Sequence, residues 1–159
     1  MHGEAADQAV AERPNVVLIM ADDLGYHDLG GYGHPKIKTP VLDRMAKRGV
    51  KLTAFYAGAT VCTPSRMALM TGSYPIRLGW SKGVVGHILS TAHGLRPRAV
   101  TLAERFKSAG YQPAMSGKWH LGDRRPFRPH RQGFDHAYYI NKSNNPPHKK
   151  DTNKHDNTY

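Results

Sequence analysis

The run Val16–Met20 is short, rich in β-branched side chains and apolar at every position. Such a run is typical of a strand buried on both faces of a parallel sheet, because a half-buried strand alternates apolar and polar side chains. Asp22 and Asp23 follow almost at once, so the apolar stretch falls far short of the ~18 residues that a membrane-spanning helix needs. The sequence therefore predicts a central strand over 16–20 and no membrane span.

Helix-start and helix-stop signals occur at three later places. A cap followed by proline, or a capping box, opens each helix, and a glycine follows its last turn. The predicted helices cover 40–48, 65–71 and 102–109. Two further strands are predicted over 50–57 and near 111–116, although Pro113 confines the second to a sheet edge or a bulge. This alternation of strands and helices predicts an α/β layered fold.

The length of 159 residues suits one ordinary domain. Residues 1–13 form a polar lead-in, residues 14–140 hold the predicted elements, and residues 141–159 are polar enough to be expected disordered. The first residues have no basic flank and no apolar stretch, so no signal peptide is predicted. The chain as written is therefore expected in the cytoplasm, or in an exported or lysosomal location if its N-terminus is incomplete.

Charge is distributed unevenly along the chain. There are 23 Lys and Arg against 12 Asp and Glu, and residues 81–159 hold 14 of the basic and 5 of the acidic side chains. A basic half of this kind can serve nucleic acid, an anionic surface or an anionic substrate. A fragment that binds nucleic acid nonspecifically is one alternative, and the absence of a nucleic-acid recognition motif in the sequence counts against it.

Asp22 and Asp23 are adjacent carboxylates at the end of the predicted strand. Ligands of open α/β sheets bind beyond the carboxyl ends of strands, which nominates this pair and the residues after Ser116 as site-forming. Like charges this close repel, and a hard cation with oxygen ligands would turn that repulsion into binding. The alternative is a solvated turn that caps a helix.

Cys62 is the only cysteine, so it can form neither an internal disulfide nor a cysteine-rich zinc site. It stands just before a predicted helix start, where free backbone N–H groups and the helix dipole favour an anion. Arg66, four residues later, projects over the same face if the first turn includes Cys62. The alternative is a small buried core residue.

The segment Cys62-Thr63-Pro64-Ser65-Arg66, continued to Thr71-Gly72, resembles the full signature of the sulfatase family, Cys-x-Pro-Ser-Arg-x-x-Leu-x-Thr-Gly. The segment from Pro14 to Gly25 is similar to the first strand and metal-binding aspartates of that family. Gly117-Lys118-Trp119-His120-Leu121-Gly122 is similar to its second signature, although Pro113 stands where Thr or Ser is usual. The resemblance covers about residues 13–140, in the family's order, and is closest to the arylsulfatase type.

The resemblance implies the N-terminal part of a catalytic domain with an incomplete alkaline-phosphatase-like fold, a mixed sheet flanked by helices. It also implies that a formylglycine-generating enzyme converts Cys62 to formylglycine and that the substrate is a sulfate ester. The hydrated aldehyde supplies two hydroxyls on one carbon: one attacks sulfur, and the other later expels sulfate. Family members run to several hundred residues, so this chain is expected to be truncated and impaired on its own.

The resemblance also implies a role for each matching residue. The implied catalytic residues are Cys62, Arg66, Lys118 and His120, and the implied ligands of a calcium ion are Asp22, Asp23 and the hydroxyl at position 62. Arg66 would orient the hydrate, Lys118 would hold the sulfate and a formylglycine oxygen, and His120 would manage a proton. Hydrolysis of a phosphonate or phosphate monoester on the same scaffold is the related alternative, because these tetrahedral oxyanions differ from sulfate mainly in charge.

Overall fold

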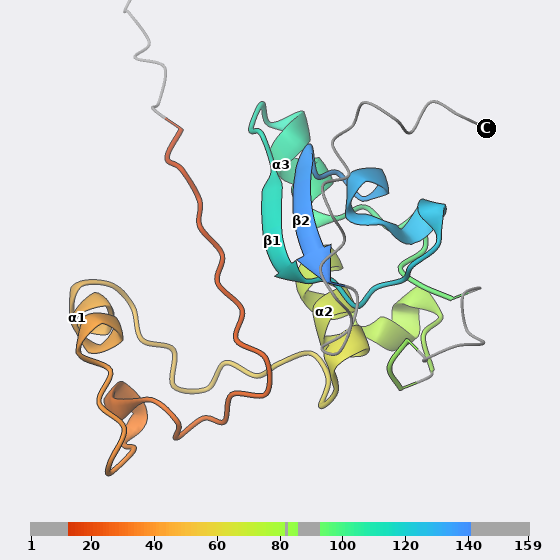
Figure 1. The fold of residues 1–159 in the computed structure, drawn as a ribbon. Coiled ribbons are helices and arrows are strands. Elements are labelled where there is room, and N and C mark those ends of the chain that lie inside the picture. The colour runs from red at the N-terminus through yellow and green to blue at the C-terminus, as the bar shows by residue number, and fades with distance from the viewer. Residues whose placement is uncertain (1–12, 82, 86–92, 141–159) are drawn as a thin grey trace, which may run out of the picture. The chain divides into compact units, whose positions relative to one another are not determined.

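The structure, a computed structural model, describes residues 13–81, 83–85 and 93–140. The chain divides into two units, Met1–Lys51 and Leu52–Tyr159 (Figure 1). The predicted tail and all but the last residue of the predicted lead-in lie outside the described residues. Within the described part, no helix combines the length and the apolar character that crossing a membrane would require.

In the first unit, the described helices are η1 (Gly30–Tyr32), a 3-10 turn, and α1 (Pro40–Arg48). The predicted helix over 40–48 is confirmed, with Pro40 at its start and Gly49 just beyond its end. The Thr39 hydroxyl accepts a hydrogen bond from the Gly30 N–H (3.0 Å) and donates to the Asp43 carboxylate (2.8 Å). One side chain therefore joins the two helical segments.

The predicted strands over 16–20 and 50–57 are wrong, because both segments lack regular secondary structure. The side chains of Val16–Met20 are 39 to 83% exposed. A strand that is apolar on both faces becomes stable when neighbouring strands pair with its two edges and other layers cover its faces. The described residues of the first unit contain no strand that could do so.

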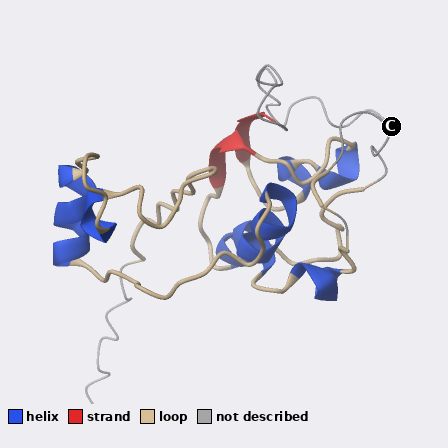
Figure 2. Cartoon of the chain, turned by 90° about the horizontal axis from the view of Figure 1, so that it is seen from below, coloured by secondary structure: helices blue, strands red, loops and turns tan. Residues whose placement is uncertain are grey.

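The second unit holds a small sheet among helices and turns (Figures 1 and 2). Strands β1 (Ala114–Lys118) and β2 (His136–Ile140) pair in parallel, from Ala114 opposite His136 to Lys118 opposite Ile140. The strand predicted near 111–116 is present but begins after Pro113. Proline has no N–H for a ladder, and the Pro113 carbonyl instead accepts a hydrogen bond from the Asp135 N–H (2.9 Å).

Two longer helices accompany this sheet, α2 (Cys62–Thr71) and α3 (Leu102–Ser108). Helix α2 begins three residues before the predicted start, since a proline is tolerated in the first turn, where N–H groups have no intrahelical acceptor. It ends as predicted at Gly72, whose φ of 63° is the left-handed conformation that glycine adopts readily. The predicted capping box of α3, between Thr101 and Glu104, is confirmed.

The remaining helical elements are short 3-10 turns: η2 (Pro75–Leu78), η3 (Arg125–Phe127) and η4 (Pro129–Arg131). The core of the second unit consists of Met67, Trp80, Val85, Leu95, Trp119, Leu121 and Tyr139. Trp119 and Leu121 flank His120, and Met67 lies on α2. The core therefore fixes the segment after β1 against α2.

Candidate active site

Cys62 is the first residue of α2 and is half-buried. The hydrogen bond from the Ser65 N–H to the Val61 carbonyl (3.1 Å) opens the helical pattern, so the N–H groups of Cys62 and Thr63 precede the intrahelical ladder. These groups and the helix dipole make the surroundings of the thiol favourable for negative charge.

Lys118 is the last residue of β1, and its side chain extends from the sheet to the side chain of Cys62. Its Nζ donates a hydrogen bond to the Cys62 Sγ over 3.2 Å. Two residues 56 positions apart in the sequence thus meet through their side chains. The hydrogen bond places the positive charge of the Lys118 ammonium beside the side-chain atom of residue 62.

Arg66 lies one helical turn after Cys62, as the spacing predicted, and its side chain is buried. Its Nη1 donates to the carbonyl oxygen of Lys118 at 2.5 Å. The Arg66 guanidinium therefore binds the backbone of Lys118, and the ammonium of Lys118 contacts Cys62. Helix α2 holds Lys118 at both its side chain and its main chain.

His120 follows two residues later and is 8% exposed. Its φ of 56° is uncommon for a residue with a side chain. The His120 carbonyl accepts a hydrogen bond from the Thr63 hydroxyl (2.9 Å), which itself accepts one from the Val85 N–H (2.9 Å). Thr63 is fully buried.

Sequence reasoning missed Thr63 because it occupies the variable second position of the five-residue signature. One signal was available: Thr63 and the apolar Met67 are four residues apart, on the buried face of a helix. A hydroxyl on such a face needs hydrogen-bond partners from other segments. The structure supplies both.

Asp22 and Asp23 belong to the first unit, in a turn that follows the irregular run over 16–20. Both side chains are exposed, and Asp23 has a φ of 56°. The second unit brings together Cys62, Arg66, Lys118 and His120. The calcium site that would add the two aspartates stays a prediction.

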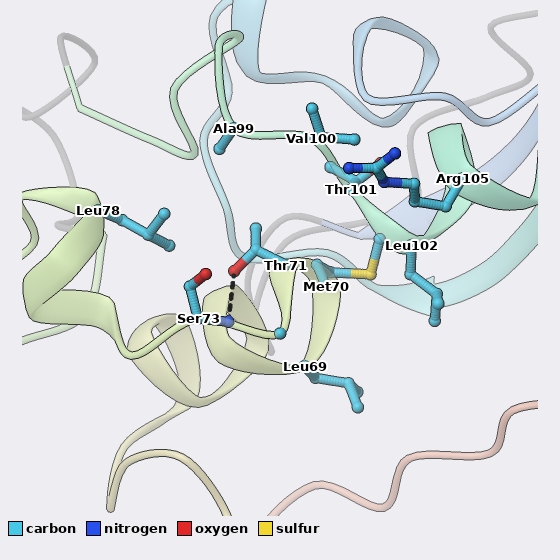
Figure 3. Close-up of a pocket in the computed structure, with 11 residues that line it drawn as sticks. Leu69, Met70, Thr71, Ser73, Leu78, Ala99, Val100, Thr101, Leu102 and Arg105 are labelled. Carbon is cyan, nitrogen blue, oxygen red and sulfur yellow. Dashed lines mark hydrogen bonds between the residues drawn. The ribbon is translucent and has the colours of Figure 1, made fainter. Parts of the chain in front are cut away.

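A cavity of about 480 Å³ lies near the other end of α2 (Figure 3). Leu69, Met70 and Thr71 of α2 line it, together with Leu102 and Arg105 of α3. The Thr71 hydroxyl accepts a hydrogen bond from the Ser73 N–H (3.3 Å) at its wall. The lining includes none of Cys62, Arg66, Lys118 and His120.

Comparison with known proteins identifies the family. The sulfatase family model matches residues 14–159, and the chain therefore belongs to the sulfatase family. Its described part is an incomplete sulfatase fold of the alkaline-phosphatase-like class, as the resemblance implied.

Similarity to individual proteins agrees with this assignment. Human arylsulfatase A is 51% identical over 132 residues, which are 82% of this chain and 26% of that protein. Human steryl-sulfatase is 44% identical over 148 residues, 87% of this chain and 25% of that protein. The crystal structure of the PsFucS1 sulfatase from Pseudoalteromonas sp. superposes with a TM-score of 0.67 at 33% identity, over 82% of this chain and 26% of that one. The chain thus spans about a quarter of the length of these relatives.

Proposed function

We propose that this chain supplies the nucleophile and its surrounding cations in the active site of an enzyme that hydrolyses sulfate esters. The observation that carries the proposal is the position of Cys62 at the start of α2, with the Lys118 Nζ 3.2 Å from its Sγ. Membership of the sulfatase family supports the reaction class. A helix start and a fixed ammonium together suit a group that attacks an anionic ester.

The modified side chain at position 62 would be formylglycine, whose hydrate supplies an attacking hydroxyl and a second hydroxyl through which sulfate is released. The surroundings fit this group, because an oxygen in place of Sγ can accept the hydrogen bond that Lys118 now donates to sulfur. The next five residues, Thr63–Met67, are buried in the folded chain. A formylglycine-generating enzyme would therefore act before this segment folds.

The roles of the neighbouring residues follow from the negative charge that develops on sulfate oxygens. Lys118 would stabilise that charge directly, and the N–H groups at the start of α2 would add to the effect. Arg66 would hold Lys118 in place through its carbonyl. His120 would exchange a proton with the hydroxyl at position 62 through its imidazole.

The metal ion is proposed to be calcium, bound by Asp22, Asp23 and an oxygen at position 62. The donor set fits a hard divalent cation, since the aspartates offer only oxygen atoms and two negative charges. Calcium takes about 6–8 oxygen ligands, so water or other protein groups would complete its shell. The ion would balance the charge of the incoming ester.

The test is hydrolysis by the protein that contains this chain, produced together with a formylglycine-generating enzyme. Peptide mass spectrometry would measure conversion at Cys62, and turnover would be compared on an aryl sulfate and the matching aryl phosphate. We expect conversion and preferential turnover of the sulfate. Preference for the phosphate would favour the phosphate monoester alternative, and converted protein inactive on both would refute the proposal. Tight duplex binding at physiological salt would instead revive the nucleic-acid alternative.

A further inference from the structure

The hydroxyl of Thr63 joins three segments of the second unit. It lies on α2, donates to the carbonyl of His120 after β1, and accepts from the N–H of Val85. Both hydrogen bonds measure 2.9 Å, and Thr63 has no exposed surface. Water cannot replace either partner without a rearrangement of the core.

The backbone of His120 needs such support. Its φ of 56° lies in the left-handed region, which residues with a Cβ adopt when surrounding contacts impose it. The neighbouring residues are held by main-chain bonds: the Trp119 N–H donates to the Ile140 carbonyl, and the Leu121 carbonyl accepts from the Leu95 N–H, both at 2.8 Å. The carbonyl of His120 itself is held by Thr63.

Two side chains of helix α2 therefore donate hydrogen bonds to carbonyls of the segment 118–120. Arg66 holds that of Lys118 and Thr63 holds that of His120. Cys62 lies on the same helical turn as Thr63. A single rigid element thus sets the position of residue 62 relative to the two side chains that are proposed to act on its substrate.

We propose that Thr63 is a positioning residue of the sulfatase reaction, which fixes the backbone of His120 and thereby aims its imidazole. The proposal rests on the function proposed above. It concerns the hydroxyl and not the size of the side chain, so that serine can replace threonine and valine cannot. Small displacements of a catalytic group, on the order of 1 Å, can lower a rate about 10²-fold.

Thr63→Val removes the hydroxyl and preserves the shape, while Thr63→Ser preserves the hydroxyl. Neither variant changes Cys62, Pro64, Ser65 or Arg66, so the fixed positions of the conversion signature remain. Thr101→Val is the matched control. Thr101 is also fully buried, and its hydroxyl donates to the Gln132 carbonyl (2.7 Å) and accepts from the Glu104 N–H (3.1 Å). Neither partner is one of the proposed catalytic residues.

The experiment measures kcat and KM for an aryl sulfate, normalised to formylglycine content, in the protein that contains this chain. We expect Thr63→Val to lower kcat about 10- to 100-fold with KM within about 3-fold of the parent. Thr63→Ser should restore kcat to within about 3-fold of the parent, and Thr101→Val should lower thermal stability without this loss of kcat. If Thr63→Val does not fold, Thr63→Ala and Thr63→Ser, which differ by one oxygen, give the same comparison.

A second measurement does not depend on activity. The imidazole signals of ¹⁵N-histidine-labelled protein are recorded, with His120 assigned by its loss in His120→Gln. We expect the His120 signal to shift in Thr63→Val and to stay in place in Thr63→Ser and Thr101→Val. A parent protein that turns over no sulfate ester refutes the proposed function alone. An unmoved His120 signal, or equal kcat in Thr63→Val and Thr101→Val, overturns the positioning role.

Discussion

Replacement of Lys118 by methionine removes the charge and keeps most of the side chain's length. The Nζ lies 3.2 Å from the Cys62 Sγ, and at this distance a full negative charge gains about 5 kcal/mol at an effective dielectric constant of about 20. The charge that develops in the transition state is spread over several oxygens, which reduces this to about 2 kcal/mol for the oxygen that faces Lys118. The lost hydrogen bond from a charged donor contributes about 1.5 kcal/mol or more.

We therefore expect Lys118→Met to lower kcat/KM for an aryl sulfate by about 10²–10³-fold, the range found when one oxyanion donor is removed. The assay is steady-state turnover by the protein that contains this chain, normalised to formylglycine content. Lys107→Met is the control, because it changes the net charge equally on α3, where Lys107 forms an exposed ion pair with Asp135 and contributes little to stability. A loss below about 5-fold in Lys118→Met, or an equal loss in both variants, would refute the assigned role.

Three further expectations concern the nucleophile, the metal and the core. Cys62→Ser keeps one hydroxyl but lacks the release route, so mass spectrometry should show one sulfate retained per site and little turnover; repeated turnover at the parent rate would contradict the mechanism. Chelation should abolish turnover and added calcium restore it, with more calcium needed by Asp22→Asn; unchanged activity in excess chelator would exclude the metal. Gly94→Ala should lower the free energy of unfolding by about 1–3 kcal/mol, because the alanine Cβ would lie 2.6 Å from the Phe127 Cγ and also against the Leu121 carbonyl. A melting temperature equal to that of the parent would refute this close packing around Gly94.

The helices could be predicted from the sequence because their signals act within a few residues. The capping box of Thr101 and Glu104 and the glycine after α2 are local hydrogen-bond and backbone effects, and both are present in the structure. Strand β1 begins three residues later than predicted, because the effect of Pro113 on strand pairing depends on which strand lies opposite. That partner, β2, is more than 15 residues further along the chain.

In the candidate site, too, relations between residues close in sequence could be predicted, and contacts between distant segments could not. The signature residues Cys62 and Arg66 are four apart on one helix, so their common face could be predicted. The contact of Lys118 with Cys62 depends on tertiary packing, and the order of the two motifs indicated it only through the family resemblance. The four-residue spacing of Thr63 and Met67 could indicate a buried hydroxyl at position 63, but its two backbone partners, at His120 and Val85, depend on tertiary packing.

The run over 16–20 shows why the failed strand predictions are informative. Its side chains are apolar, yet 39 to 83% of their surface is exposed. The pattern specifies a strand covered on both faces, and the chain spans about a quarter of the length of its relatives. Burial of this run by further strands would therefore place Asp22 and Asp23 at the carboxyl end of a buried strand, where α/β sheets bind ligands. The two proposed metal ligands would then acquire a fixed geometry only when the strand before them is paired, which would couple formation of the sheet to formation of the site.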